Sequence, residues 1–237
     1  FYVCRELKKE FPNLLSYTRF VERMPRVAIP LLLFLKLGLM GECTGITFID
    51  STRIPVCENK RQSRNRVFKG YAQKGKSTMG WYYGFKLHLL CNERGELLNF
   101  ALTRANVDDR NPKVFNDLTK DLFGKLYADK GYISQSLFAS LFDRGVHIVT
   151  GIRTNMKNRL MDAHDKIMLR KRSIIETIND MLKNVAQIVH TRHRSISNFI
   201  VNLLAGIAAY AFYDTKPSIN MEFEMEEKQG VKQLTLF

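Results

Sequence analysis

The order of the predicted secondary-structure elements constrains the fold of this chain more than any other feature. From residue 46 onward, short runs of β-branched and aromatic residues alternate with segments whose apolar positions recur at helical spacing. Three strands come first, the second and third joined by a turn at Asn92–Gly95, and helices separate the remaining strands. This order predicts an α/β fold, with a mixed five-stranded sheet and helices on both faces. We expect strands at 46–50, 82–91, 96–103, 125–129 and 146–150, and helices at 111–123, 134–144, 166–190 and 196–213.

The segments that flank these elements have a different character. Helical spacing of apolar residues fills 1–42, with Ser16 as an expected N-cap and 27–40 as an expected buried helix. Residues 57–80 are rich in Lys, Arg, Gly, Gln and Ser and predict a long loop. We expect the acidic tail at 214–237 to be disordered up to its last few residues.

Charge gives the first indication of a partner. The 237 residues carry 37 Lys and Arg against 23 Asp and Glu, a formal charge of +14. The tail is acidic, so the 34 basic and 18 acidic residues of 1–213 give +16. A surplus of this size predicts a polyanionic partner, either nucleic acid or a membrane surface. The cations gather in a loop and do not line one face of an amphipathic helix, which disfavours the membrane.

Cysteine and histidine usage excludes several classes of site. The four cysteines form no C-x-x-C pair and the five histidines no metal-ligand set, so we expect no zinc site. Reduced thiols in a cytoplasmic protein are the expected state. The most apolar run, 27–40, is shorter than the ~20 residues that a membrane span needs.

Three carboxylates are candidates for a metal site. Asp50 and Asp129 each end a predicted strand, and functional sites of open α/β sheets lie at that edge. Glu176 shares a polar helix stripe with Arg172 and Lys183, at spacings of four and seven residues. Oxygen ligands of this kind suit Mg²⁺ or Mn²⁺. Taken singly, each has an ordinary alternative, since both aspartates could serve turns and Glu176 a solvated helix face.

The sequence contains the three segments Thr47-Phe-Ile-Asp-Ser-Thr52, Tyr127-Ala-Asp-Lys-Gly-Tyr132 and Arg172 to Lys183. Together they resemble the DDE transposases of bacterial insertion sequences, which have a ribonuclease H-like catalytic core. The loop Ala105–Asp109 also looks like a loop of that family, and the match covers roughly 45–210. The family pattern Tyr-x2-Arg-x3-Glu-x6-Lys is present except for its tyrosine, which is Leu169 here.

The resemblance implies a reaction and a set of roles. Asp50, Asp129 and Glu176 would hold two Mg²⁺ or Mn²⁺ ions, which clamp a phosphate for cleavage at the element's end and transfer of the 3′-OH strand into target DNA. A homodimer on DNA is implied as well. Two alternatives stay open: a ribonuclease H-like nuclease without strand transfer, and an inactive DNA-binding remnant of a transposase.

The resemblance also implies a division into domains. Residues 1–44 would be a helical segment at the end of an N-terminal DNA-binding domain, and 45–213 the catalytic domain. The chain begins at Phe1 without Met, within a helical pattern, so we expect the natural protein to be longer at its N-terminus. The expected location is the nucleoid of a bacterial cytoplasm.

DNA contacts are expected mainly from the basic loop. Its seven cations come without a carboxylate, and Tyr71 and Trp81–Tyr83 supply aromatic rings that could stack on unpaired bases. Trp81 could equally be an ordinary core residue. The expected DNA-binding residues are Lys60, Arg61, Arg64, Arg66, Lys69, Lys74 and Lys76 in the loop, Arg153, Lys157 and Arg159 after the fifth strand, and Arg172 and Lys183 on the late helix.

The last five residues carry a separate prediction. Gln233-Leu-Thr-Leu-Phe237 resembles the peptide by which bacterial proteins dock on the replicative sliding clamp. A short extended peptide on a flexible leash can insert Leu234, Leu236 and Phe237 into an apolar pocket while Gln233 orients it. The alternative is that the same apolar side chains fold back on the core.

Overall fold

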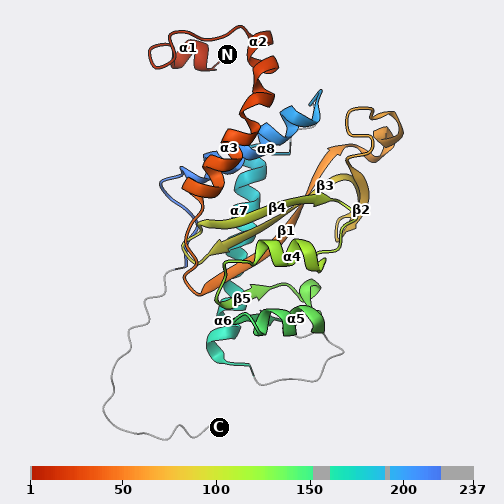
Figure 1. Cartoon of the computed structure of the whole chain (residues 1–237), viewed down its shortest axis with the longest axis vertical. Helices are drawn as coiled ribbons and strands as arrows, with labels where there is room; N and C mark the ends of the chain where they lie inside the picture. Colours follow the sequence, from red (N-terminus) through yellow and green to blue (C-terminus); the bar gives the residue numbers. More distant parts are fainter. Residues whose placement is uncertain (1, 152–160, 190–192, 220–237) are drawn as a thin grey trace, which may run out of the picture.

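A mixed sheet forms the centre of the molecule in the computed structural model, which describes residues 2–151, 161–189 and 193–219 (Figure 1). Within these residues the sheet has six strands rather than the expected five. The strands are β1 (Ile46–Cys57), β2 (Gln73–Ser77), β3 (Gly80–Asn92), β4 (Leu97–Arg104), β5 (Gly124–Ala128) and β6 (Val146–Thr150).

The strand order places the first and fifth strands side by side. The sheet runs β2-β3-β1-β5-β6, and β4 pairs with the part of β3 that lies beyond β2. The long strands β1 and β3 are antiparallel, whereas β1, β5 and β6 are parallel to one another. A hairpin followed by parallel strands with helical crossovers confirms the mixed ribonuclease H-like sheet expected from the sequence.

Helices cover both faces of the sheet, as predicted. On one face, α4 (Pro112–Leu118) and α5 (Gln135–Phe142) bury Phe115, Leu137 and Leu141 against β1, β5 and β6. On the other face, α6 (Ala163–Lys171), α7 (Ser173–Asp180) and α8 (Ile196–Ala211) close a larger core around Phe48 and Tyr127. The sheet is therefore the middle layer of three.

The first strand extends beyond its predicted end. β1 continues through residue 57 because β3 pairs with it along that whole length, and Thr52, Ile54 and Val56 point inward in strand alternation. Asp50 thus lies inside a strand and not at its end. The predicted loop at 57–80 is also partly wrong, since it contains the 3₁₀-helix η3 (Asn59–Arg64) and strand β2.

The predicted helix at 166–190 is divided. Arg172 separates α6 from α7, and the π-helix η5 (Met181–Val185) follows α7 directly. The helical path ends at Ala186, before Gln187 takes a positive φ of 50°.

The short 3₁₀-helix η4 (Lys130–Tyr132) follows Asp129.

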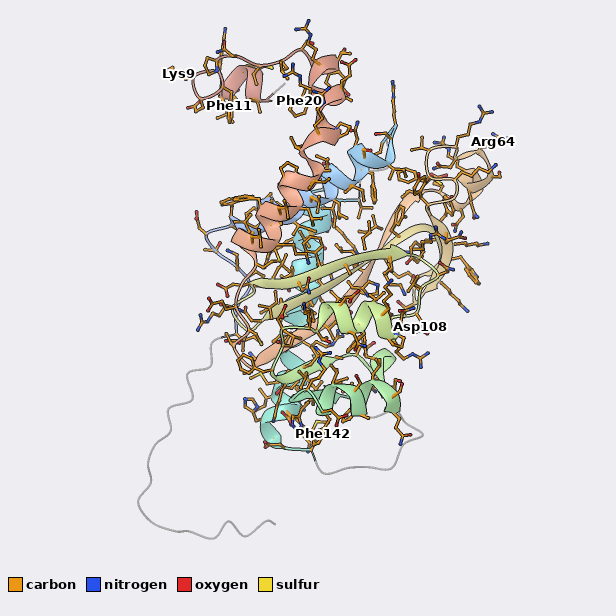
Figure 2. The ribbon with its side chains drawn as sticks, viewed as in Figure 1. Lys9, Phe11, Phe20, Arg64, Asp108 and Phe142 are labelled. Atoms are coloured by element: carbon orange, nitrogen blue, oxygen red, sulfur yellow. The ribbon has the colours of Figure 1, made fainter. Side chains whose placement is uncertain are left out.

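The N-terminal segment is helical, in short pieces: α1 (Tyr2–Glu6), α2 (Tyr17–Arg23), the 3₁₀-helix η1 (Met24–Val27), α3 (Ala28–Phe34) and the π-helix η2 (Leu35–Leu39). Ser16 is confirmed as the N-cap of α2, accepting from the Arg19 amide. α1 and α2 extend away from the sheet (Figures 1 and 2). The expectation that 27–40 is buried is wrong, because Leu35 alone in this range is fully buried. No helix of the described residues is long and apolar enough to cross a bilayer.

The first residues of the acidic tail pack on the β3–β4 turn, contrary to the expected disorder. The Ile219 amide donates to the carbonyl of Glu93 at 2.8 Å, and the Tyr210 hydroxyl donates to the carbonyl of Gly95 at 2.7 Å. Gly95 has a φ of 75°, and a Cβ there would lie 2.0 Å from the carbonyl oxygen of Pro217. The turn therefore requires glycine both for its conformation and for this close approach.

Candidate active site

Asp50 of β1 and Asp129, the residue that follows β5, lie at the same level of the sheet. Phe48 of β1 pairs with Tyr127 of β5. Asp50 comes two residues after Phe48, and Asp129 comes two residues after Tyr127. Strand alternation turns both carboxylates to the face that carries the Phe48 and Tyr127 rings, whose centroids are 5.5 Å apart. The side chain of Asp50 is only 23% exposed, whereas Asp129 is exposed. Asp129 follows the end of its strand as expected, whereas Asp50 lies within β1, and their joint role at a site stays a prediction.

Glu176 reaches the same region from α7. The helix buries Ile175 and Ile178 against the core and leaves the Glu176 side chain 56% exposed. Arg172, one turn earlier, donates from Nη2 to Oε1 of Glu176 at 2.8 Å. Its Nη1 lies 3.6 Å from Oδ1 of Asp50. The Arg172 guanidinium therefore bridges two of the three candidate carboxylates.

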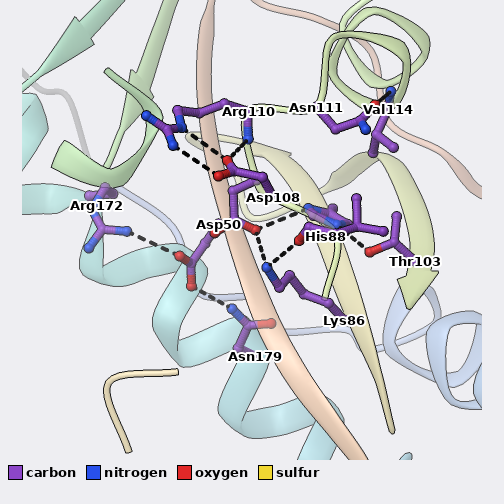
Figure 3. A network of polar contacts seen from close by, with 12 residues as sticks. Asp50, Lys86, His88, Thr103, Asp108, Arg110, Asn111, Val114, Arg172 and Asn179 are labelled. Carbon is purple, nitrogen blue, oxygen red and sulfur yellow. Dashed lines mark hydrogen bonds and ion pairs between the residues drawn. The ribbon is translucent and has the colours of Figure 1, made fainter. Parts of the chain in front are cut away.

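Asn179 is a residue of this site that the sequence reasoning missed. Its Nδ2 donates to Oδ2 of Asp50 at 2.9 Å, and the residue is buried (Figure 3). A signal was available, because Asn179 is a polar residue within the otherwise apolar stripe of Ile175, Ile178 and Leu182. A buried amide needs a partner, and here that partner is the central carboxylate.

The surroundings of Asp50 disfavour its charge. Burial raises the pKa of Asp50 to about 6, and the negative charges of Glu176 and Asp129 act in the same direction. Arg172 and the Ser51 amide oppose this shift without cancelling it. A carboxylate that is crowded by other carboxylates gains by binding a cation.

The donor set fits a divalent cation in its chemistry. Asp50, Asp129 and Glu176 offer only oxygen ligands, which Mg²⁺ and Mn²⁺ prefer. Across the described parts of the chain, no three acidic, histidine or cysteine side chains come close enough together to hold an ion. Arg172 instead supplies the positive charge between Asp50 and Glu176. The three-carboxylate metal site consequently stays a prediction.

A second polar cluster surrounds Asp109, in the loop that follows β4. Oδ1 of Asp109 lies 2.9 Å from Nζ of Lys86 and 3.8 Å from Nδ1 of His88 (Figure 3). Nε2 of His88 is 2.9 Å from Oγ1 of Thr103, and burial lowers the pKa of His88 to about 4. Since His88 is neutral at pH 7, Lys86 is the main partner of the Asp109 charge. Sequence reasoning placed the loop in a family motif but missed Lys86 and His88.

A family model described as a transposase DDE domain matches residues 40–196. The match covers most of the chain, including all three candidate carboxylates. The chain belongs to this family. No curated protein matches the sequence of this DDE domain.

Two solved structures are similar to this DDE domain. One is a cryo-EM structure of the piggyBac transposase synaptic complex with hairpin DNA, with 11% identity and a TM-score of 0.47, covering 73% of this chain. The other is the crystal structure of the Mos1 strand transfer complex, with 10% identity and a TM-score of 0.32, covering 86% of this chain. The chain spans 47% of the piggyBac chain and 65% of the Mos1 chain.

The basic loop of the DDE domain forms an exposed surface, the η3–β2 surface. All seven of its predicted DNA-binding cations are exposed, and within the described residues none forms an ion pair with a carboxylate. Lys60, Arg61 and Arg64 lie on η3, Arg66 and Lys69 on the turn after it, and Lys74 and Lys76 on β2.

The aromatic residues near this surface divide into two groups. Trp81 is 55% exposed and is therefore not a core residue, and Nζ of Lys74 lies 5.2 Å from its ring centroid. Tyr71 is also exposed. Tyr82 and Tyr83 are buried and cannot stack on a base, contrary to expectation.

The remaining predicted site residues are placed only in part. Lys183 lies on η5, within electrostatic reach of Asp50 and Arg53. Burial lowers the pKa of Lys183, and Arg53 acts in the same direction. Outside the described residues lie Arg153, Lys157, Arg159, Gln233, Leu234, Leu236 and Phe237.

Proposed function

We propose that this DDE domain catalyses metal-dependent cleavage of DNA at insertion-sequence ends and transfer of the 3′-OH strand into target DNA. The observation that carries the proposal is that Asp50 and Asp129 each come two residues after the paired residues Phe48 and Tyr127 of two adjacent parallel strands. Glu176 of α7 and Arg172, which precedes α7, lie near Asp50, so the region combines carboxylates for a cation with a cation for phosphate.

Each residue has a defined task in this proposal. Asp50, Asp129 and Glu176 would hold two Mg²⁺ or Mn²⁺ ions, which when bound supply Lewis-acid stabilisation of the phosphate and an activated water or 3′-OH. Asn179 orients the Asp50 carboxylate through its 2.9 Å hydrogen bond. Once Arg172 is released from the carboxylates, its planar guanidinium can bind a phosphate with two parallel hydrogen bonds. Lys183, on the same helical path, adds a second cation near Asp50.

We propose that double-stranded DNA, both element end and target, runs along the η3–β2 surface. Seven exposed cations without carboxylate partners can replace the counterions of the phosphate backbone. Arg153, Lys157 and Arg159 are proposed to contact the same DNA. Trp81 supplies an exposed ring next to Lys74 for an unpaired base.

The domain organisation and the assembly are proposals too. Residues 45–213 would form the catalytic domain, and 1–44 the end of an N-terminal DNA-binding domain. A homodimer on DNA is supported by the many exposed apolar side chains of α2 and α3, among them Phe20, Ile29 and Leu33. Light scattering with and without DNA tests it, and Ile29→Asp should shift a dimer towards monomer.

We further propose that the C-terminal peptide 233–237 docks on a bacterial sliding clamp, which would place the domain beside replicating DNA in the cytoplasm. The match of its sequence to a clamp-binding peptide supports this. Binding of the peptide to a purified clamp should be lost when Phe237 is replaced by alanine.

Cleavage of labelled DNA that carries the host element's end tests the central proposal. With Mg²⁺ or Mn²⁺, the protein should produce nicked and joined DNA, and the Asp129→Ala variant should produce neither. Nicked DNA without joined products would favour a nuclease. If wild type and variant both bound DNA and neither cut it, the result would favour an inactive DNA-binding remnant.

A further inference from the structure

A polar cavity of about 530 Å³ opens on the α4 face of the sheet, across β1 from the Asp50 carboxylate and next to the turn that follows Asp129. Its walls are the loop 105–110, Lys76 of β2, Lys86 of β3 and Gly131 of η4. Gly131 follows Asp129 by only two residues, so the cavity borders the turn that leaves the active edge.

The phenol of Tyr132, the residue after the cavity-lining Gly131, is buried. Burial raises the pKa of Tyr132 well above its ordinary value, and the charges of Asp109 and Asp50 both add to this shift. Asp109 lines the cavity, and Asp50 lies at the candidate active site. The Tyr132 hydroxyl therefore lies within electrostatic reach of both carboxylates.

The walls of the cavity carry both signs of charge, and both of their carboxylates are paired with a cation. Asp108 accepts two hydrogen bonds from the Arg110 guanidinium, at 3.0 and 2.9 Å. Lys86 is paired with Asp109 and also donates to the carbonyl of Val107 at 2.8 Å. A phosphate would meet two carboxylates here, and a metal ion would meet three cations. A neutral group that bears both donors and acceptors, such as the edge of a nucleobase, matches these walls.

Asp109 is held ready as a hydrogen-bond acceptor. The Lys86 ion pair and the His88 contact both involve Oδ1, and within the described residues no group donates to Oδ2. Oδ2 can therefore accept from an exocyclic amine, which cytosine and adenine possess and thymine lacks.

An aromatic ring lies next to the cavity. Lys76 lines the cavity and also places its Nζ 6.0 Å from the ring centroid of Trp81. The exposed Trp81 indole can stack on a base neighbouring the one that enters the cavity. Stacking and hydrogen bonding together select single-stranded DNA over duplex, whose base edges are already paired.

We propose that this cavity receives one unpaired base of the DNA strand at the active site and prefers bases with an exocyclic amine. The inference rests on the proposed function, because that function is what brings a DNA strand to Asp129. The cavity would then act as a specificity site for the nucleotide beside the cleaved bond.

Anisotropy of fluorescein-labelled tetranucleotides, without metal so that nothing is cut, tests the proposal. Deoxycytidine and deoxyadenosine tetranucleotides should bind about tenfold more tightly than a thymidine tetranucleotide or an abasic one with the same phosphates. Asn106→Trp places a bulky ring in the cavity and should abolish this difference. The matched control is Asn116→Trp, on an exposed position of α4, which should retain it.

A second variant guards against misfolding of the first. Asp109→Asn places an amide donor beside the base and should reduce the preference for amino-bearing bases, while circular dichroism reports on folding. Equal affinity for all four tetranucleotides, absence of binding, or a preference that Asn106→Trp leaves intact would overturn the proposal.

The outcome is separable from that of the proposed function. The Asp129→Ala variant should keep the base preference although it cannot cut DNA. Base preference without metal-dependent cleavage in the wild type would remove the proposed function alone. Cleavage without base preference would remove the cavity proposal alone.

Discussion

Asn179 donates a hydrogen bond from Nδ2 to Oδ2 of Asp50 at 2.9 Å, across 129 positions of the chain. The contact joins α7 to the middle of β1. At this point β1 still pairs with β3 on one side, but its pairing with β5 on the other side has ended. Because Asn179 is buried and Asp50 nearly so, the hydrogen bond fixes the orientation of the carboxylate before any ligand arrives.

Replacement of Asn179 by alanine should weaken Mg²⁺ binding by roughly tenfold or more, because partners of metal ligands typically contribute 10- to 100-fold to affinity. Isothermal titration calorimetry measures the effect. Asn184→Ala is the control, since Asn184 is exposed and bonds to Asp180 instead. Equal Mg²⁺ affinity in both variants would show that Asn179 has no role at the metal site.

The raised pKa of Asp50 predicts a pH dependence of Mg²⁺ binding. Protonation near pH 6 removes the charge that binds the ion, so Mg²⁺ affinity should fall as the pH is lowered from 7 to 5. An affinity that is flat over this range would contradict the assignment of Asp50 as a ligand.

The same shift predicts a change in the stability of the metal-free protein. The folded-state pKa is about 6 and the ordinary value 3.8, so between these pH values the folded protein binds more protons than the unfolded chain. The contribution of Asp50 to stability is therefore lost as the pH rises through 6. Relative to wild type, Asp50→Asn should gain stability between pH 4 and 7, by at most about 3 kcal/mol. Urea unfolding of both proteins at a series of pH values measures this difference, which should not vary with pH if the shift is absent.

The strands whose positions were predicted well are those whose own residues favour a strand. β6 was predicted at its observed bounds, and β5 within one residue, because each is a short apolar run next to a glycine. β2 was missed because its sequence, Gln-Lys-Gly-Lys-Ser, has no apolar residue and becomes a strand only by pairing with β3. β1 was cut short because Ser51-Thr52 and Pro55 resemble turn chemistry, although β3 keeps the chain extended.

The candidate site was predictable where chemistry follows sequence spacing, and not where it depends on tertiary contact. The three carboxylates and Arg172 stand in recognisable segments, and the structure brings Asp50, Glu176 and Arg172 together. The Lys86–Asp109 pair joins residues 23 positions apart on a strand and a loop. Local pattern cannot reveal such a contact, because it depends on how β3 and the loop after β4 pack.

Arg172 should stabilise the protein mainly when metal is absent. Its guanidinium bridges Asp50 and Glu176 and is 18% exposed, so Arg172→Ala should lower stability at pH 7 by about 2 kcal/mol without Mg²⁺. Mg²⁺ should reduce this loss, because the ion replaces the missing positive charge. Thermal unfolding of wild type and variant, with and without Mg²⁺, measures both effects. Arg170→Ala, at an exposed position of α6, should change neither melting temperature.

Gly75 should be required for the position of the loop 105–110. A Cβ at residue 75 would lie 2.2 Å from the carbonyl oxygen of Ala105, so the backbone of β2 or of the loop must move to admit it. Overpacking of this kind typically costs about 1–3 kcal/mol. Gly75→Ala should therefore lower stability in urea unfolding and, by displacing a wall of the cavity, weaken binding of the deoxycytidine tetranucleotide. Gly38→Ala is the matched control, because its Cβ would meet only the Phe34 ring, at 3.7 Å. If Gly75→Ala matched wild type in both urea stability and binding of the deoxycytidine tetranucleotide, Gly75 would not be required for the position of the loop.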